Sequence, residues 1–178
     1  MSPITKLFQA IESQNFWEKT IYLKRNVNLV EPLKNNSNLY YVVSGCVIVY
    51  REEEPNEQLI RFGYEGSFIC CLDSFLNNEV SEFGIKAIKE TQVKCISKTI
   101  FFEFINSSST FQKLWIHILN QLVLQCIDRE KDLLTSSPES RYQRVLKRSP
   151  QLFQMVPHKY IASYLRMSPE TLSRLKKS

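Results

Sequence analysis

Hydrophobic and polar residues follow two different periods along this chain. From residue 82 to 88, apolar side chains alternate with polar or small ones, which is the pattern of a strand with one buried face. Residues 39–50 are rich in β-branched and aromatic side chains and predict another strand, followed by a polar turn at 52–57. Several such short runs lie between residues 22 and 97. They favour an antiparallel sandwich, barrel or jelly roll over a parallel sheet with crossover helices.

A long helix is predicted after these strands, because residues 111–134 contain neither Pro nor Gly. Its apolar residues cover more than one side, so the helix needs more than one covering surface. One side can pack on the β-domain, and the same helix of a second subunit can cover the other. We therefore expect a homodimer, with contacts from Trp115, Ile118, Leu122 and Cys126. The alternative is a helix buried inside one subunit.

The C-terminal part begins with a helix-capping signal. Ser137-Pro138-Glu139 supplies an N-cap, a proline at the first helical position and an acidic first turn, and it predicts a helix through Arg148 that Pro150 ends. We place a domain boundary before this signal. The expected α+β chain then has three parts: an antiparallel β domain over 1–110, a dimerisation helix over 111–136 and a small all-α domain over 137–178.

Within that last part, residues 157–177 predict two short helices joined by a tight turn. The start of the second helix is clearly marked: Ser168 is an N-cap, Pro169 takes the first helical position and Glu170 lies in the first turn. Leu172 and Leu175 are spaced to face inward. This is the plan of a helix-turn-helix, whose second helix presents polar residues to base edges in the major groove of DNA.

The charge distribution supports a polyanionic partner for the same segment. The whole chain has a formal charge of +5, but residues 138–178 carry nine Lys or Arg residues and only two Glu residues. The rest of the chain is therefore slightly acidic. Such an asymmetry is typical of a protein with a nucleic-acid-binding end, and we expect double-stranded DNA to be the partner.

Side-chain chemistry divides the expected DNA contacts into two classes. Arg174 can donate to O6 and N7 of guanine, Glu170 can accept from N4 of cytosine, and Ser173 can do either. Phosphate contacts fix the register without reading sequence. For that role we expect Lys159, Arg166, Ser168, Thr171, Lys176 and Lys177.

Other chemistries find little support. The five cysteines form no CxxC pair and no Cys/His cluster, and His117 and His158 lie on predicted helices rather than on strands of a metal-dependent barrel. There is no Gly-rich phosphate loop, nucleophile elbow or pair of carboxylates spaced for catalysis. The N-terminus has no signal-peptide pattern, and no apolar run is long enough to cross a membrane. We expect a cytoplasmic protein that is not an enzyme and holds no metal or other cofactor.

Three stretches together resemble the CRP/FNR family of bacterial transcription regulators, in particular its short members typical of Bacteroidetes. They are LYYVVSGCVIVY, FGYEGSFICCLDSFLNNEVSEFGIKAI and, most specifically, PHKYIASYLRMSPETLSR. The resemblance implies a β-roll of the cyclic-nucleotide-binding type, a long dimerisation helix and a C-terminal helix-turn-helix. The E-x-x-S-R pattern with which this family reads bases falls on Glu170, Ser173 and Arg174.

The chain departs from the family pattern at its effector site. Members that bind cAMP carry a Gly-Glu pair for the ribose and an Arg-Ser or Arg-Thr pair for the cyclic phosphate. Cys70-Cys71 and Ser81-Glu82 stand at the matching positions. The cation for the phosphate is missing and Glu82 brings like charge, so we do not expect cAMP to bind in the usual mode. Another small-molecule effector, or none, remains open.

Two further departures concern the DNA-binding end. Arg166 takes the turn position that is usually Gly, where a positive φ strains any other residue. The sequence also ends shortly after the second helix, so we expect a small module without a following wing. The alternative to a regulator is a ligand-sensing or dimerisation module, which could bind cyclic nucleotides and whose C-terminal hairpin contacts a protein instead of DNA.

Overall fold

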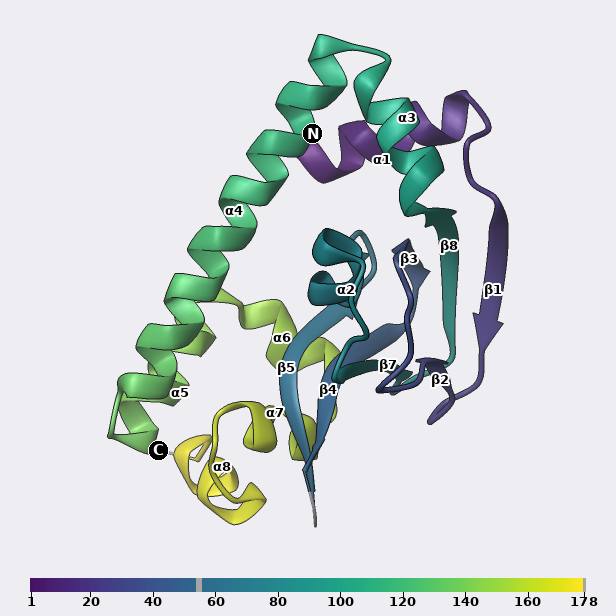
Figure 1. Cartoon of the computed structure of the whole chain (residues 1–178). Helices are drawn as coiled ribbons and strands as arrows, with labels where there is room; N and C mark the ends of the chain where they lie inside the picture. Colours follow the sequence, from purple (N-terminus) through teal and green to yellow (C-terminus); the bar gives the residue numbers. More distant parts are fainter. Residues whose placement is uncertain (54–55, 178) are drawn as a thin grey trace. The chain divides into compact units, whose positions relative to one another are not determined.

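The structure is a computed structural model that describes residues 1–53 and 56–177 (Figure 1). The chain divides into two compact units, residues 1–120 and residues 121–178. The division falls inside the long helix α4 (Ser109–Leu134), which begins two residues before its predicted start and ends where predicted. No helix among the described residues has the length and apolar character needed to cross a membrane.

The first unit is built on two four-stranded antiparallel sheets, in the strand orders β1-β8-β3-β6 and β2-β7-β4-β5. Figure 1 shows β4 and β5 as a long hairpin. This arrangement confirms the expected antiparallel β-roll. The strands are β1 (Lys19–Leu23), β2 (Asn28–Val30), β3 (Asn38–Ser44), β4 (Cys46–Glu53), β5 (Asn56–Tyr64), β6 (Phe68–Ile69), β7 (Phe83–Ala87) and β8 (Thr91–Ser97).

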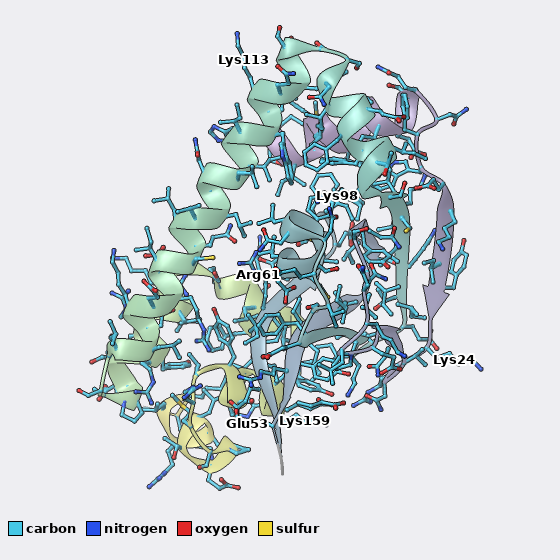
Figure 2. The ribbon with its side chains drawn as sticks, viewed as in Figure 1. Lys24, Glu53, Arg61, Lys98, Lys113 and Lys159 are labelled. Carbon is cyan, nitrogen blue, oxygen red and sulfur yellow. The ribbon has the colours of Figure 1, made fainter. Side chains whose placement is uncertain are left out.

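One hydrophobic core lies between the two sheets, and side chains from both fill the space (Figure 2). On β7 the predicted alternation holds only over its second half, where Ile85 and Ala87 are fully buried and Lys86 is half-buried, while Phe83 is only half-buried. Gly84 is buried too, and a Cβ at this position would lie 2.9 Å from both Pro32 Cδ and Tyr50 Cε1. The alternating pattern therefore marks a strand that is covered more on one face than on the other.

Helices cover one end of the first unit and enclose a second core. They are α1 (Pro3–Ser13), α2 (Leu72–Asn77), α3 (Lys98–Asn106) and the first part of α4. Aromatic rings dominate this core. Trp115 of α4 packs edge-on against Phe101, with ring centroids 4.9 Å apart, and it also contacts Phe75. The beginning of α4 is therefore anchored in the chain's own interior.

The second unit is all-α and comprises the end of α4 followed by four short helices. They are α5 (Pro138–Arg148), α6 (Pro150–Met155), α7 (His158–Tyr164) and α8 (Pro169–Leu175). The capping signal before α5 is confirmed, since the Ser137 side chain accepts a hydrogen bond from the Ser140 N–H. Pro150 ends α5 as expected but also opens α6, a helix that the sequence pattern did not predict.

The small core of this unit gathers apolar side chains from α5 to α8. Val145, Ile161, Leu165 and Leu172 are at most 1% exposed. Because these residues come from α5, from α7 and its C-cap, and from α8, the unit has an interior of its own that packs α7 against α8.

Candidate nucleic-acid interface

Helices α7 and α8 form a compact helix-turn-helix with well-defined hydrogen bonds in the turn. The N–H of Arg166 donates to Ser163 O at 3.0 Å, and the N–H of Met167 donates to Ala162 O at 3.1 Å. These two bonds make a Schellman motif, in which the residue after the helix cap takes a left-handed conformation. That residue is Arg166, with a φ of 50°. The positive φ expected at this position is thus present, although the residue is not glycine.

The start of α8 is fixed by its own sequence. The Ser168 side chain accepts a hydrogen bond from the Thr171 N–H at 3.2 Å, and Pro169 occupies the first turn. Leu172 is fully buried in the small core. The N-cap and the buried leucine together determine which side of α8 points away from the unit.

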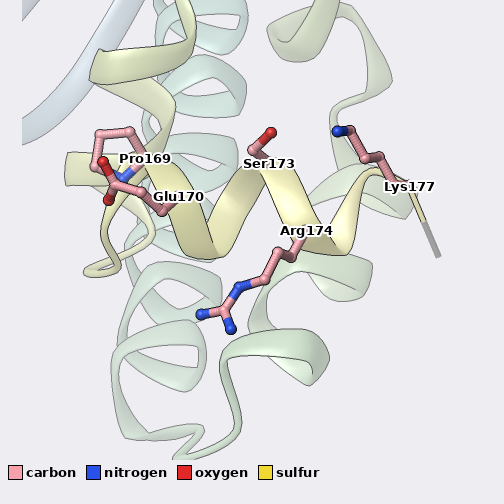
Figure 3. Close-up of a pocket in the computed structure, with 5 residues that line it drawn as sticks. All are labelled: Pro169, Glu170, Ser173, Arg174 and Lys177. Carbon is pink, nitrogen blue, oxygen red and sulfur yellow. The ribbon is translucent and has the colours of Figure 1, made fainter.

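The outward side of α8 carries the residues predicted to read bases. Glu170, Ser173 and Arg174, together with Pro169 and Lys177, line one open depression on the surface. Figure 3 shows them along the helix, with Glu170 near its N-terminal end and Lys177 just beyond its C-terminal end. Acceptor and donor groups suited to base edges therefore occur along a single helix, as the sequence spacing predicted.

Glu170 is held in its charged form. Hydrogen bonds from its own backbone N–H and from Ser168 lower the pKa of its carboxyl group, and the positive charge of Arg174 lowers it further. An ionised carboxylate is acceptor-only, so it suits the amino group of cytosine and repels a phosphate.

The residues expected at phosphates are mostly at the surface. Lys159, Arg166, Ser168, Lys176 and Lys177 are exposed, whereas Thr171 is half-buried and its backbone N–H is used by the cap. Figure 2 labels Lys159, which lies on α7 with its Nζ 4.7 Å from the ring centre of Tyr160. The exposed charges of Lys159, Arg166, Lys176 and Lys177 give the second unit a positive surface.

Two charged contacts in the second unit were missed by sequence reasoning. The carboxylate of Asp132 is fully buried and pairs with Arg144 and Arg148, which lie one turn apart on α5. The guanidinium of Arg141 donates to four main-chain carbonyl oxygens. The four-residue spacing of Arg144 and Arg148 is a signal that could have indicated a shared acidic partner, whereas nothing local identifies the partners of Arg141.

The residues at the effector positions are engaged within the first unit. Cys70, Cys71 and Ser81 are buried, and the Cys71 Sγ lies 3.3 Å from Phe83 O. Burial raises the pKa of Cys70 to about 12 and that of Cys71 to about 11, so both thiols are protonated at neutral pH. Glu82 is exposed, and its carboxylate lies 3.2 Å from Arg51 Nε. The structure thus brings Cys71 and Ser81 close together but leaves Glu82 on the surface.

The residues expected at a dimer contact differ widely in exposure. Trp115 is 9% exposed and belongs to the aromatic core, and Ile118 packs against that core. Leu122 is half-buried and Cys126 is exposed. The large apolar side chains of α4 that stay exposed are Ile116, Val123, Leu124, Ile127, Leu133 and Leu134.

Solved transcription regulators share this architecture. A CooA mutant from Carboxydothermus hydrogenoformans matches with a TM-score of 0.74 at 17% identity, over 93% of this chain and 77% of the other. FixK2 from Bradyrhizobium japonicum gives 0.72 at 17% identity, over 89% and 82%. A transcriptional regulator of the CRP/FNR family from Thermus thermophilus gives 0.65 at 16% identity, over 88% and 83%. No family model and no curated protein matches the sequence.

The matches cover both the β-roll and the helical unit, and they agree with the resemblance found in the sequence. The resemblance implied three components, and the structure contains them: the sandwich of two antiparallel sheets, the long α4 and the α7–α8 pair. The chain has the fold of the CRP/FNR family of transcription regulators.

Proposed function

We propose that this chain is a cytoplasmic, homodimeric transcription regulator that binds DNA in a sequence-specific manner. The observation that carries the proposal is the outward side of α8, where Glu170, Ser173 and Arg174 lie together on a capped helix of a basic unit. A helix of this kind presents its N-terminal polar residues to base edges when it enters the major groove.

In the proposed complex Arg174 makes the main base contact. Its guanidinium donates to O6 and N7 of a guanine, and the ionised Glu170 accepts from N4 of a nearby cytosine. Ser173, between them, donates or accepts. The exposed cations Lys159, Arg166, Lys176 and Lys177 contact phosphates, and the backbone N–H groups at the start of α8 offer further donors.

Dimerisation is proposed to use the exposed apolar side of α4. Val123 is 57% exposed, Leu124 62% and Ile127 40%, and Ile127 lies one turn after the other two on the helix. Together with Cys126 they are better placed for a second subunit than Trp115 and Ile118, which pack inside the chain. Two α8 helices related by a two-fold axis would then read half-sites about one helical turn of DNA apart.

The effector site is proposed not to accept cAMP in the usual mode. Glu82, at a position where that mode needs a partner for the cyclic phosphate, is a surface carboxylate paired with Arg51. Ser81 is fully buried and its side chain accepts from the Phe83 N–H. The β-roll either takes an effector of different chemistry or serves as a scaffold.

The experiment that tests this function is binding to random duplex DNA across a range of salt concentrations, followed by in vitro selection of bound sequences. A regulator gives a log K that falls steeply with log salt, because phosphate contacts release counterions. Selection should then return a two-fold symmetric site. A flat salt dependence would overturn the proposal and favour the alternative, in which the C-terminal hairpin contacts a protein.

Calorimetry with cAMP and cGMP tests the effector part separately. Micromolar binding of either nucleotide would contradict the argument from Ser81 and Glu82, without affecting the argument for DNA binding.

A further inference from the structure

We infer that Arg141 is a positioning residue that sets the orientation of the recognition helix α8 relative to the C-terminal end of α4. The inference rests on the proposed function, in which α4 pairs two subunits and α8 reads DNA. In that proposal Arg141 contacts neither the DNA bases nor the second subunit. It acts by setting the direction of each α8, on which the fit of two recognition helices to one operator depends.

The geometry of Arg141 carries the inference. Its Nη1 lies 2.6 Å from Thr135 O and 3.0 Å from Ser136 O, both in the segment that joins α4 to α5. Its Nε lies 2.9 Å from Leu165 O and its Nη2 3.2 Å from Arg166 O, both in the turn between α7 and α8. One planar guanidinium therefore bonds two segments that lie 29 to 31 residues apart in the chain.

The bonded carbonyls lie where the chain turns, first between α4 and α5 and then between α7 and α8. Thr135 and Ser136 follow directly after α4, and Leu165 and Arg166 are the cap and the left-handed residue of the helix-turn-helix. Carbonyls at helix ends lack an intrahelical partner, so a cationic donor that reaches them fixes their direction. The four donors are held in a rigid fork, which Lys could not reproduce with its single ammonium group.

A second charged contact holds the helix that carries Arg141. Arg144 Nε lies 3.1 Å from Asp132 Oδ1, and Arg148 pairs with the same buried carboxylate. Helix α5 is thereby attached to the end of α4 at two of its turns. Because α5 is fixed on α4, the contacts of Arg141 transmit that fixed position to the turn that precedes α8.

The turn itself explains why such a support is needed. Arg166 has a φ of 50°, which L-residues with a side chain adopt only against a steric cost. Its carbonyl accepts from Arg141, and its N–H donates to Ser163 O. Holding that carbonyl favours the left-handed conformation, so Arg141 replaces part of the conformational freedom that glycine supplies at such a position.

The test compares Arg141→Gln with Lys147→Gln, which removes the same charge from an exposed position of the same helix. Both are measured on the selected operator, on operators whose half-site spacing is changed by one base pair, and on random duplex DNA. For Arg141→Gln we expect an operator affinity about ten- to a hundredfold below that of Lys147→Gln. Its preference for the correct spacing should also be weaker, whereas random-duplex affinities of the two variants should agree. Equal behaviour of the two variants on every DNA would overturn the inference.

A measurement without DNA separates this inference from the proposed function. Amide hydrogen exchange should be faster in Arg141→Gln at Arg166 and Met167, whose N–H groups hold the turn, and unchanged in Lys147→Gln. Unchanged exchange in both variants would overturn the inference even if the wild-type protein binds DNA. A third outcome is that the wild-type protein shows no salt-dependent DNA binding while exchange is still faster in Arg141→Gln. That result would overturn both the proposed function and the orientation role, and Arg141 would remain only a structural contact.

Two further variants cover the case in which Arg141→Gln fails to fold. Arg141→Lys keeps the charge but not the fork, and it should show the same spacing defect in weaker form. The affinity lost through Arg141→Lys should also be smaller when position 166 is glycine. The double variant is therefore compared with Arg166→Gly alone, since glycine needs no support at this φ. Absence of both the spacing defect and this smaller loss would contradict the role of Arg141.

Discussion

Asp132 near the end of α4 and Arg148 at the end of α5 are joined by a two-pronged ion pair. Arg148 Nη1 lies 3.3 Å from Asp132 Oδ1, and Nη2 lies 2.5 Å from Oδ2. Arg144 donates to the same carboxylate, whose side chain is fully buried while both arginines are partly exposed. Removing the charge of a buried carboxylate that has two cationic partners should lower the free energy of unfolding.

Asp132→Asn should destabilise the protein. The amide keeps the shape of the side chain but loses the charge that both arginines face, and partial exposure of the arginines limits the cost to about 1–3 kcal/mol. Asp128→Asn is the matched control on the same helix, because Asp128 lies 4.0 Å from exposed Lys131 and should contribute under about 1 kcal/mol. Denaturant unfolding measures both variants, and equal effects would show that the buried pair has no special weight.

Arg174→Ala should lower operator affinity by about 1–3 kcal/mol and relax the sequence preference at one base pair. The reason is the loss of a bidentate donor from the outward side of α8. Quantitative binding to operators with each base substituted in turn measures the effect. An unchanged base preference would remove Arg174 from the base-reading set.

Lys176→Ala should weaken binding to all sequences alike and reduce the slope of log K against log salt by about 1. Lys176 is exposed and is proposed to contact a phosphate rather than a base. Comparison of the salt slopes on operator and on random DNA tests this assignment. A loss restricted to the operator would instead mean that Lys176 reads sequence.

Ile127→Glu should weaken the dimer without unfolding the subunit, because Ile127 is 40% exposed in the single chain. A carboxylate in an apolar contact is costly, so the dimer dissociation constant should rise at least about tenfold. Gln125→Glu, at another exposed position of α4, controls for the added charge. Sedimentation at several protein concentrations distinguishes the two variants, and equal dissociation would move the interface elsewhere.

A single subunit, separated from its partner by dilution or by Ile127→Glu, should present one reactive thiol, and the proposed dimer contact should protect that thiol. Cys126 is exposed, whereas the other four cysteines are buried. Burial raises the pKa of Cys70 to about 12, and that of Cys46, Cys71 and Cys95 to about 11, from an ordinary value of 9.0. A thiol-specific reagent near pH 8 should therefore modify Cys126 rapidly and the others only after unfolding. Rapid modification of a second thiol would contradict the burial.

The same shifts predict a loss of stability in alkali. The folded chain keeps these thiols protonated more strongly than the unfolded chain does. Their stabilising effect is thus complete below pH 9 and declines as the pH rises from 9 toward 11. Thermal unfolding followed between pH 8 and pH 11, with Cys71→Ser as a comparison, measures this decline.

The parts of the structure that could be predicted from sequence are those with local causes. Ser137 and Ser168 cap helices through hydrogen bonds to residues only three positions away, and each is followed by proline. Such signals are complete within one turn of chain. The antiparallel β-roll and the positive φ at position 166 were implied by the family resemblance.

The parts that could not be predicted depend on contacts between distant residues. Trp115 has the spacing of a dimer contact, but its burial depends on Phe75 and Phe101, which lie far from it in sequence. The bonds of Arg141 depend on how the α7–α8 turn folds back toward the end of α4. Periodicity shows which residues share a side of a helix, but it does not show which distant residues pack against that side.

Gly84 has a consequence for how this sequence can vary. The atoms that would meet a Cβ belong to the rings of Pro32 and Tyr50, which cannot rotate aside as a flexible chain end would. Gly66 has a φ of 85° but nothing within 4 Å of its missing Cβ, so asparagine is a reasonable substitute there. In a library of variants selected for folding, position 84 should therefore be the most restricted, whereas at position 66 only the strain of a positive φ opposes a side chain.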